Sequence, residues 1–113
     1  MGVINHDVVL ATTWRSIHFD RMWVWIQSLN EYEKPLFIRG DSKMNNYKTI
    51  ILLPDGSKEG WEDSLKGDEL REKFIHQIKK HAFEDKSSPW DWVWVSYGEY
   101  GQKVEEGNCT LGL

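Results

Sequence analysis

The histidines are the residues of this chain best suited to acid–base chemistry or metal binding, but their spacing supports neither role. His76 and His81 lie five residues apart in a predicted helix, which puts them on different faces, whereas a helical metal pair lies about one turn apart. His6 and Asp7 are adjacent, and adjacent residues of a strand point to opposite faces. The single cysteine, Cys109, allows neither an intrachain disulfide nor a thiolate metal site. The sequence therefore predicts no catalytic residue, no metal site and no cofactor.

Three polar side chains are candidates for binding a ligand. Arg15 directly precedes a predicted helix, and the N–H groups at a helix N-terminus attract anions. His18 lies in the first turn of that helix, and Arg39 ends a predicted strand. A pocket lined by these residues and Trp94, between the open sheet face and the C-terminal tail, is one alternative hypothesis. It would make the protein a small-ligand-binding or enzymatic domain.

Three of the seven tryptophans of the chain occupy every second position of one segment. Trp90, Trp92 and Trp94 therefore share one face of a predicted strand, while Val93 and Val95 share the other. We predict that the valines pack against the core and that the tryptophans lie on the opposite face. Because tryptophan is enriched among interface hot spots, these three residues are the main candidates for a binding surface.

Composition narrows the classes of function. The chain has 113 residues and a formal net charge of −4, which disfavours broad attraction to nucleic acid phosphates. The aromatic residues also fall on the wrong strands for an RNA-recognition domain, so nucleic-acid binding is the third hypothesis. The sequence shows neither a secretory signal pattern nor an apolar run long enough for a membrane span. We therefore expect a cytoplasmic protein with one domain, residues 1–101, and a tail or extra strand, residues 102–113.

Hydrophobic periodicity predicts six elements in the order β-α-β-β-α-β. They cover residues 8–13, 17–32, 35–39, 47–53, 68–83 and 88–98. This order predicts an α+β domain of the ferredoxin-like, split βαβ type, with a four-stranded antiparallel sheet and both helices on one face. The first and third strands are apolar on both faces and should be central, which leaves the second and fourth at the edges. In an alternative, Pro54-Asp55-Gly56 forms a hairpin turn and residues 58–61 an extra strand.

These observations favour a binding role over catalysis. We predict a small interaction protein, such as an inhibitor or adaptor, that binds a protein partner or a second copy of itself through the face with the tryptophans. Monomers rarely leave a large apolar sheet face exposed, so we expect either a second copy, forming a homodimer, or the C-terminal tail to cover it. On this hypothesis, Trp92→Ala and Trp94→Ala would change association or partner binding and leave the fold intact.

Overall fold

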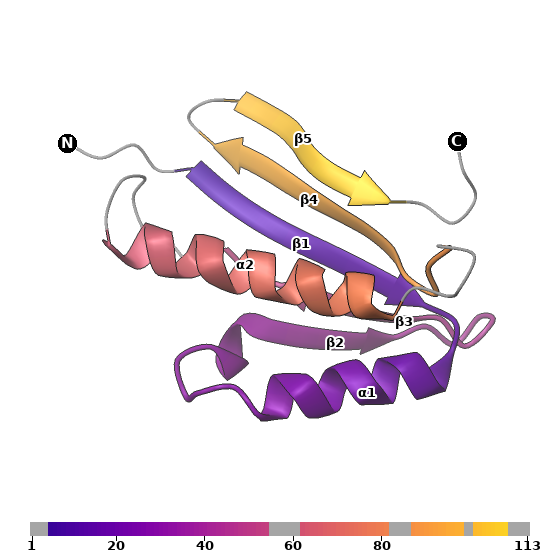
Figure 1. The fold of residues 1–113 in the computed structure, drawn as a ribbon. Helices are drawn as coiled ribbons and strands as arrows, with labels where there is room; N and C mark the ends of the chain where they lie inside the picture. The colour runs from indigo at the N-terminus through magenta and orange to yellow at the C-terminus, as the bar shows by residue number, and fades with distance from the viewer. Residues whose placement is uncertain (1–4, 55–61, 82–86, 99–100, 109–113) are drawn as a thin grey trace.

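The computed structural model describes residues 5–54, 62–81, 87–98 and 101–108 (Figure 1). Its elements, in chain order, are β1 (Asn5–Thr13), α1 (Ser16–Gln27), a 3-10 turn (Lys34–Leu36), β2 (Phe37–Asp41), β3 (Lys48–Leu52), α2 (Glu62–Lys80), β4 (Asp91–Gly98) and β5 (Gly101–Asn108). The α+β class is confirmed. The first four strands and the two helices follow one another in the predicted order, and β5 lies in the segment predicted to be a tail or an extra strand.

The four predicted strands form an antiparallel sheet that a fifth strand extends. The strand order is β2-β3-β1-β4-β5, and every neighbouring pair is antiparallel. β1 and β3 are interior strands, as their apolar residues on both faces predict. The prediction that β4 is an edge strand is wrong, because β5 pairs along it from Trp92 to Gly98.

The predicted helices differ from the observed ones mainly at their ends. α1 begins at Ser16, one residue before the predicted start, and Arg15 occupies the N-cap position without a side-chain capping bond. The same helix ends at Gln27, five residues before the predicted end. The Asn30 side chain stabilises the turn that follows, because its Oδ1 accepts hydrogen bonds from the N–H groups of Tyr32 and Glu33.

The core lies between one face of the sheet and the two helices. Trp25 of α1 stacks on Phe74 of α2, with ring centroids 6.4 Å apart. Phe37 of β2 meets Phe74 edge-on at 5.2 Å, a favoured geometry for aromatic rings. Both helices therefore pack against the same face of the sheet. The buried apolar residues form one cluster: Val9, Ala11, Phe19, Met22, Ile26, Phe37, Ile50, Leu52, Leu70, Phe74, Ile75, Ile78, Trp90 and Trp92.

Glycine geometry keeps β4 and β5 close together. Gly98 and Gly101 face each other at the end of this strand pair, and both have positive φ, 138° and 83°, which glycine tolerates best. Further along, a Cβ at Gly107 would come within 3.3 Å of Cγ2 of Val93, so only glycine allows this close approach without a local shift.

The alternative hairpin at Pro54-Asp55-Gly56, with a strand over residues 58–61, lies outside the described residues.

Candidate functional site

The alternation of side chains along the strands divides the sheet into two faces. The face that packs on the helices, here called the covered face, takes the buried positions of β1, from Asp7 to Thr13, together with Ile50 and Leu52 of β3. The residues between them belong to the opposite face, here called the open face. In the described part of the chain neither helix packs on the open face, and its side chains are half-buried or exposed.

The predicted orientation of the tryptophan-rich strand is wrong. Trp92 lies opposite Ala11 and Trp94 opposite Val9 in the β1–β4 pair, which places both indoles on the covered face. Trp90 is fully buried, Trp92 is 6% exposed, and Trp94 packs against the core. The small Ala11 leaves room for the indole beside it, and burying an indole removes more apolar area from water than burying a valine. The surface predicted for partner binding is therefore part of the core.

The indole N–H groups of Trp90 and Trp94 donate hydrogen bonds to side chains of β1 and of the residue that follows α2. Trp90 Nε1 donates to Nδ1 of His81 at 3.0 Å, and Trp94 Nε1 donates to Oδ1 of Asp7 at 3.1 Å. The guanidinium of Arg71, on α2, lies 3.8 Å from the Asp7 carboxylate and also pairs with Asp68. Both Asp7 and Arg71 are largely buried. This ion pair links α2 to β1 across the covered face.

Cations of α2 also lie over the tryptophan rings. Arg71 lies 5.9 Å from the ring centroid of Trp94, and Lys79 lies 5.8 Å from that of Trp92. These distances are within the range of cation–π attraction. Since α2 covers the two rings in this way, alanine at Trp92 or Trp94 would remove core packing. We therefore expect such variants to destabilise the fold, in contrast to the prediction from the sequence.

His18 and His81 come together beside Trp90. Their ring centroids lie 5.5 Å apart, and both side chains are largely buried. Burial, with smaller contributions from Arg21 and then His18, lowers the pKa of His81 to about 4. Burial, followed by the charges of Arg21 and Arg15, also lowers the pKa of His18. Both imidazoles are thus neutral near pH 7, and because Nδ1 of His81 accepts from Trp90, its proton is on Nε2.

Arg15 lies near His18, whose pKa its charge lowers, and both Arg15 and Arg39 also contact aromatic rings. Arg15 lies 4.8 Å from the ring of the exposed Trp14. Arg39 contacts the ring of Phe19 at 4.6 Å and pairs with Asp41 at 3.5 Å. Of the six predicted binding residues, the structure thus brings His18 and Trp90 together around His81, with Arg15 near His18. No group of three or more His, Cys, Asp or Glu residues is arranged to hold a metal ion within the described ranges.

The open face carries a continuous apolar band. Strand register aligns Ile38 with Ile51, Ile51 with Leu10, and Leu10 with Val93. These four residues form a row across β2, β3, β1 and β4, because residues directly opposite in neighbouring strands share a face. A second pair, Val8 and Val95, lies beside this row. These six residues are here called the apolar band: Val8, Leu10, Ile38, Ile51, Val93 and Val95.

Polar and aromatic side chains border the band. The hydroxyl groups of Thr12 and Thr49 form a hydrogen bond at 2.8 Å across β1 and β3. Near the other end of β1, the rings of His6 and Tyr97 lie 5.2 Å apart. Tyr97 is 41% exposed, and Ile38 at the β2 edge is 47% exposed. A half-exposed apolar patch with polar and aromatic neighbours is the arrangement expected of a contact surface.

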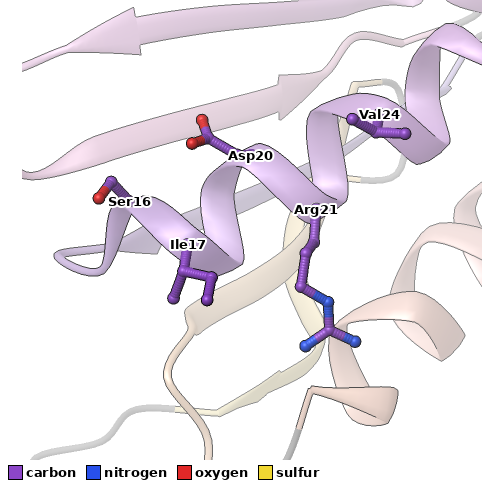
Figure 2. A pocket seen from close by; sticks show the side chains of 5 residues that line it. All are labelled: Ser16, Ile17, Asp20, Arg21 and Val24. Carbon is purple, nitrogen blue, oxygen red and sulfur yellow. The ribbon is translucent and has the colours of Figure 1, made fainter.

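A second exposed apolar surface lies on α1 (Figure 2). Ile17 and Val24 are 65% and 70% exposed and lie on either side of Arg21 along the helix. With Ser16 and Asp20 they line a depression of about 560 Å³. All five residues belong to one helix, so this is a shallow surface feature and not an enclosed pocket. Its charged residues distinguish it from the apolar band.

Sequence reasoning missed the six residues of the apolar band as site residues. Their signal was present, because apolar residues on both faces of the first and third strands imply an apolar open face.

Comparison of the chain with protein-family models, with curated proteins and with solved structures found no match. Among the described residues, no helix combines the length and the apolar character needed to cross a bilayer.

Proposed function

We propose that this protein is a non-enzymatic interaction module and that two copies associate through their open sheet faces. The observation that carries the proposal is the row Ile38–Ile51–Leu10–Val93, which crosses four strands without a charged residue. A second copy is a suitable occupant of this surface. Its own band is equally uncharged, so pairing buries apolar area on both sides without juxtaposing like charges.

The fold proposed for this module is the ferredoxin-like, split βαβ type with one added strand. Support comes from the antiparallel order β2-β3-β1-β4 with β1 and β3 in the interior, together with the β-α-β-β-α-β order of the elements. In such a plan one face of the sheet packs on helices, which leaves the opposite face for contacts.

The size of the open face sets the expected strength of association. Four strands about 4.8 Å apart, with about five residues each at about 3.3 Å, span roughly 19 Å by about 17 Å, which is an area of about 300 Å². This is less than the roughly 800 Å² per partner of a standard interface. We therefore expect a weak dimer whose population rises with protein concentration.

Sedimentation equilibrium over a range of concentrations tests the proposal. The Ile38→Lys/Val93→Lys variant places two like charges in the apolar band and is expected to remain monomeric where the wild type forms dimers. The matched control is Ile17→Lys/Val24→Lys, which makes the same changes on the exposed surface of α1 and should dimerise like the wild type. Far-UV circular dichroism checks that each variant is folded. A monomeric wild type at every concentration, or dimers that persist in the first variant, would contradict the proposal.

A further inference from the structure

The edge of the sheet at β2 is accessible in the part of the chain that the structure describes. β2 stands at one end of the strand order β2-β3-β1-β4-β5, and its residues from Ile38 to Asp41 are all exposed. Successive side chains of a strand point to opposite faces, so exposure of four residues in a row means that this edge can be reached from both faces. Gly40 lies within the exposed stretch, and a Cβ there would meet no atom within 4 Å.

The pairing of β2 with β3 determines which backbone groups face outward. Just beyond β2, the N–H of Ser42 donates to the carbonyl oxygen of Tyr47 at 2.8 Å. Backbone groups alternate in direction along an antiparallel strand, so the even-numbered residues of β2 bond to β3 and the odd-numbered ones point away from it. Arg39 and Asp41 therefore present their N–H and C=O groups at the outer edge.

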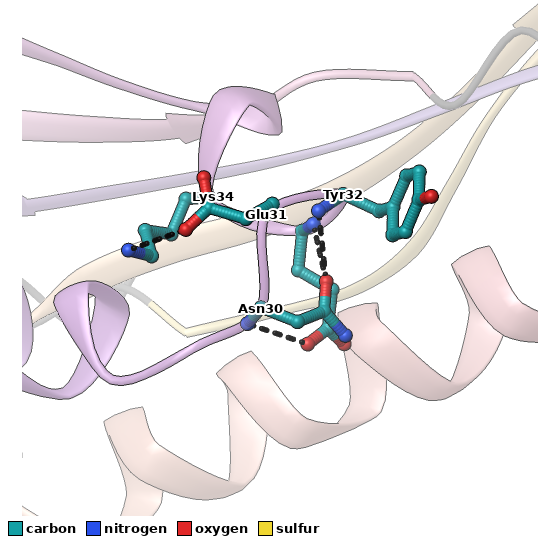
Figure 3. A network of polar contacts seen from close by, with 5 residues as sticks. Asn30, Glu31, Tyr32 and Lys34 are labelled. Atoms are coloured by element: carbon teal, nitrogen blue, oxygen red, sulfur yellow. Dashed lines mark hydrogen bonds and ion pairs between the residues drawn. The ribbon is translucent and has the colours of Figure 1, made fainter.

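The turn before β2 sets the point at which this edge begins (Figure 3). Oδ1 of Asn30 accepts hydrogen bonds at 2.9 Å from the N–H groups of Tyr32 and Glu33. The carbonyl oxygen of Lys34 accepts a hydrogen bond from the N–H of Phe37. Because the N–H of Phe37 is used within the turn, a strand added at the edge can bond fully only to the residues that follow it.

Charges of opposite sign stand two residues apart on this edge. Arg39 and Asp41 share one face of β2, and their side chains are 40% and 56% exposed. The guanidinium of Arg39 lies 3.5 Å from Oδ2 of Asp41 and 4.6 Å from the ring centroid of Phe19. Charges on an edge strand usually prevent pairing with another chain, but two opposite charges at this spacing are complementary to a second copy of themselves.

We propose that β2 pairs antiparallel with β2 of a second copy, with the two-fold axis at Gly40. In this register Arg39 lies opposite the partner's Asp41, and Asp41 lies opposite the partner's Arg39. The outward N–H and C=O groups of these residues then form four hydrogen bonds between the copies. The ion pair within each strand remains, and each charge gains a neighbour of opposite sign across the interface.

The charges also exclude the neighbouring register. Centring the pair on Arg39 instead of Gly40 would place the two guanidinium groups opposite each other, which is unfavourable. The proposed contact uses the edge of the sheet and not its open face, so it goes beyond the proposed association and does not depend on it.

Disulfide cross-linking at Gly40 tests this register. The two Gly40 residues would form a non-hydrogen-bonded pair with Cα atoms about 4.5 Å apart, which is within the range of a disulfide, about 4.4–6.8 Å. Because Cys109 is the single cysteine of the chain, the variant Gly40→Cys/Cys109→Ser carries one thiol. With oxidised glutathione as the oxidant, we expect it to form cross-linked dimers.

The matched control is Ser42→Cys/Cys109→Ser, which places the thiol two residues away at another exposed position. In the proposed register its two thiols would lie about 13 Å apart, four residues at about 3.3 Å each, so this variant should remain monomeric. No cross-linking at Gly40, or equal cross-linking at the two positions, would overturn the proposal.

Charge variants of the Gly40→Cys/Cys109→Ser protein test the complementarity. Arg39→Asp and Asp41→Arg each place like charges opposite one another, so cross-linking should be about tenfold slower, since two exposed ion pairs are lost. The swap Arg39→Asp/Asp41→Arg makes the edge complementary to itself again and should restore the rate. A swap variant as slow as the single variants would contradict the register. Far-UV circular dichroism checks that each variant is folded.

The Val93→Lys variant separates this contact from association through the open face. It places a charge in the apolar band on β4 and leaves β2 unchanged, so the cross-link at Gly40 should form as in its absence. Ile38→Lys is unsuitable for this purpose, because Ile38 belongs to β2 and a lysine on an edge strand opposes pairing. Loss of the cross-link in Val93→Lys would show that the contact at the edge requires the open face, contrary to the proposal.

Discussion

The buried contact between His81 and Trp90 predicts that the protein loses stability as the pH falls below neutral. The folded state holds the pKa of His81 at about 4, below its ordinary value of 6.5, mainly through burial. Between these two values the unfolded chain binds a proton that the folded chain does not, so the free energy of unfolding decreases as the pH falls. Protonation would also place a hydrogen on Nδ1, which accepts the hydrogen bond of Trp90. Above pH 6.5 the contribution is fully present, and below about pH 4 no further loss is expected from this group.

The magnitude follows from the two pKa values. Each pH unit between 6.5 and about 4 costs about 1.4 kcal/mol, so His81 accounts for about 3 kcal/mol over the whole interval. Lowering the pH from about 7.5 to about 5 should remove about 2 kcal/mol of this. Urea unfolding followed by tryptophan fluorescence measures the change, which should lower the midpoint by about 1 M.

The control for this prediction is His81→Gln, whose amide oxygen can accept the Trp90 hydrogen bond without titrating. Groups that do not contact His81 titrate alike in both proteins, so their contributions cancel in the difference. We expect the wild type to lose about 2 kcal/mol more than His81→Gln between the two pH values. Equal losses in the two proteins would refute the assignment of the pH dependence to His81.

Three further predictions concern the covered face, each measured as a change in the free energy of unfolding in urea. Trp92→Ala should cost about 3–5 kcal/mol, because it leaves a cavity in the core; a cost below about 1 kcal/mol would contradict its burial. Trp94→Phe should cost about 1 kcal/mol through loss of the hydrogen bond to Asp7, and an unchanged midpoint would contradict that bond. Asp7→Asn should cost more than Trp94→Phe, about 3 kcal/mol, because it leaves the buried Arg71 without its Asp7 charge partner; a smaller loss than that of Trp94→Phe would contradict a role for the ion pair.

Much of the architecture follows from local sequence patterns. Apolar residues on both faces of the first and third strands correctly place β1 and β3 in the interior of the sheet. The amphipathic spacing of Phe19, Met22 and Ile26 correctly identifies the buried side of α1. These features depend on residues close together in the chain, which is why the sequence is sufficient to predict them. The additional strand β5 has no comparable apolar pattern, so the sequence leaves it open between a strand and a tail.

The orientation of β4 required information that lies far away in the chain. The two-residue period shows that Trp92 and Trp94 share a face but does not show which face the helices cover. That choice depends on the β1 register, where Ala11 and Val9 lie opposite the two indoles, and on the cations that α2 contributes. The candidate site therefore differs from the predicted one. Val93 and Val95, which were expected to pack in the core, lie on the open face instead.

An isotope-filtered NOE experiment tests the central claim of association through the open face most directly. Equal amounts of a ¹³C-methyl-labelled and an unlabelled protein are mixed, so that only contacts between copies are detected. The proposal predicts intermolecular NOEs at the methyl groups of Leu10, Ile51 and Val93. Intermolecular NOEs confined to Ile17 and Val24 of α1, or none at concentrations where the protein is dimeric, would contradict it.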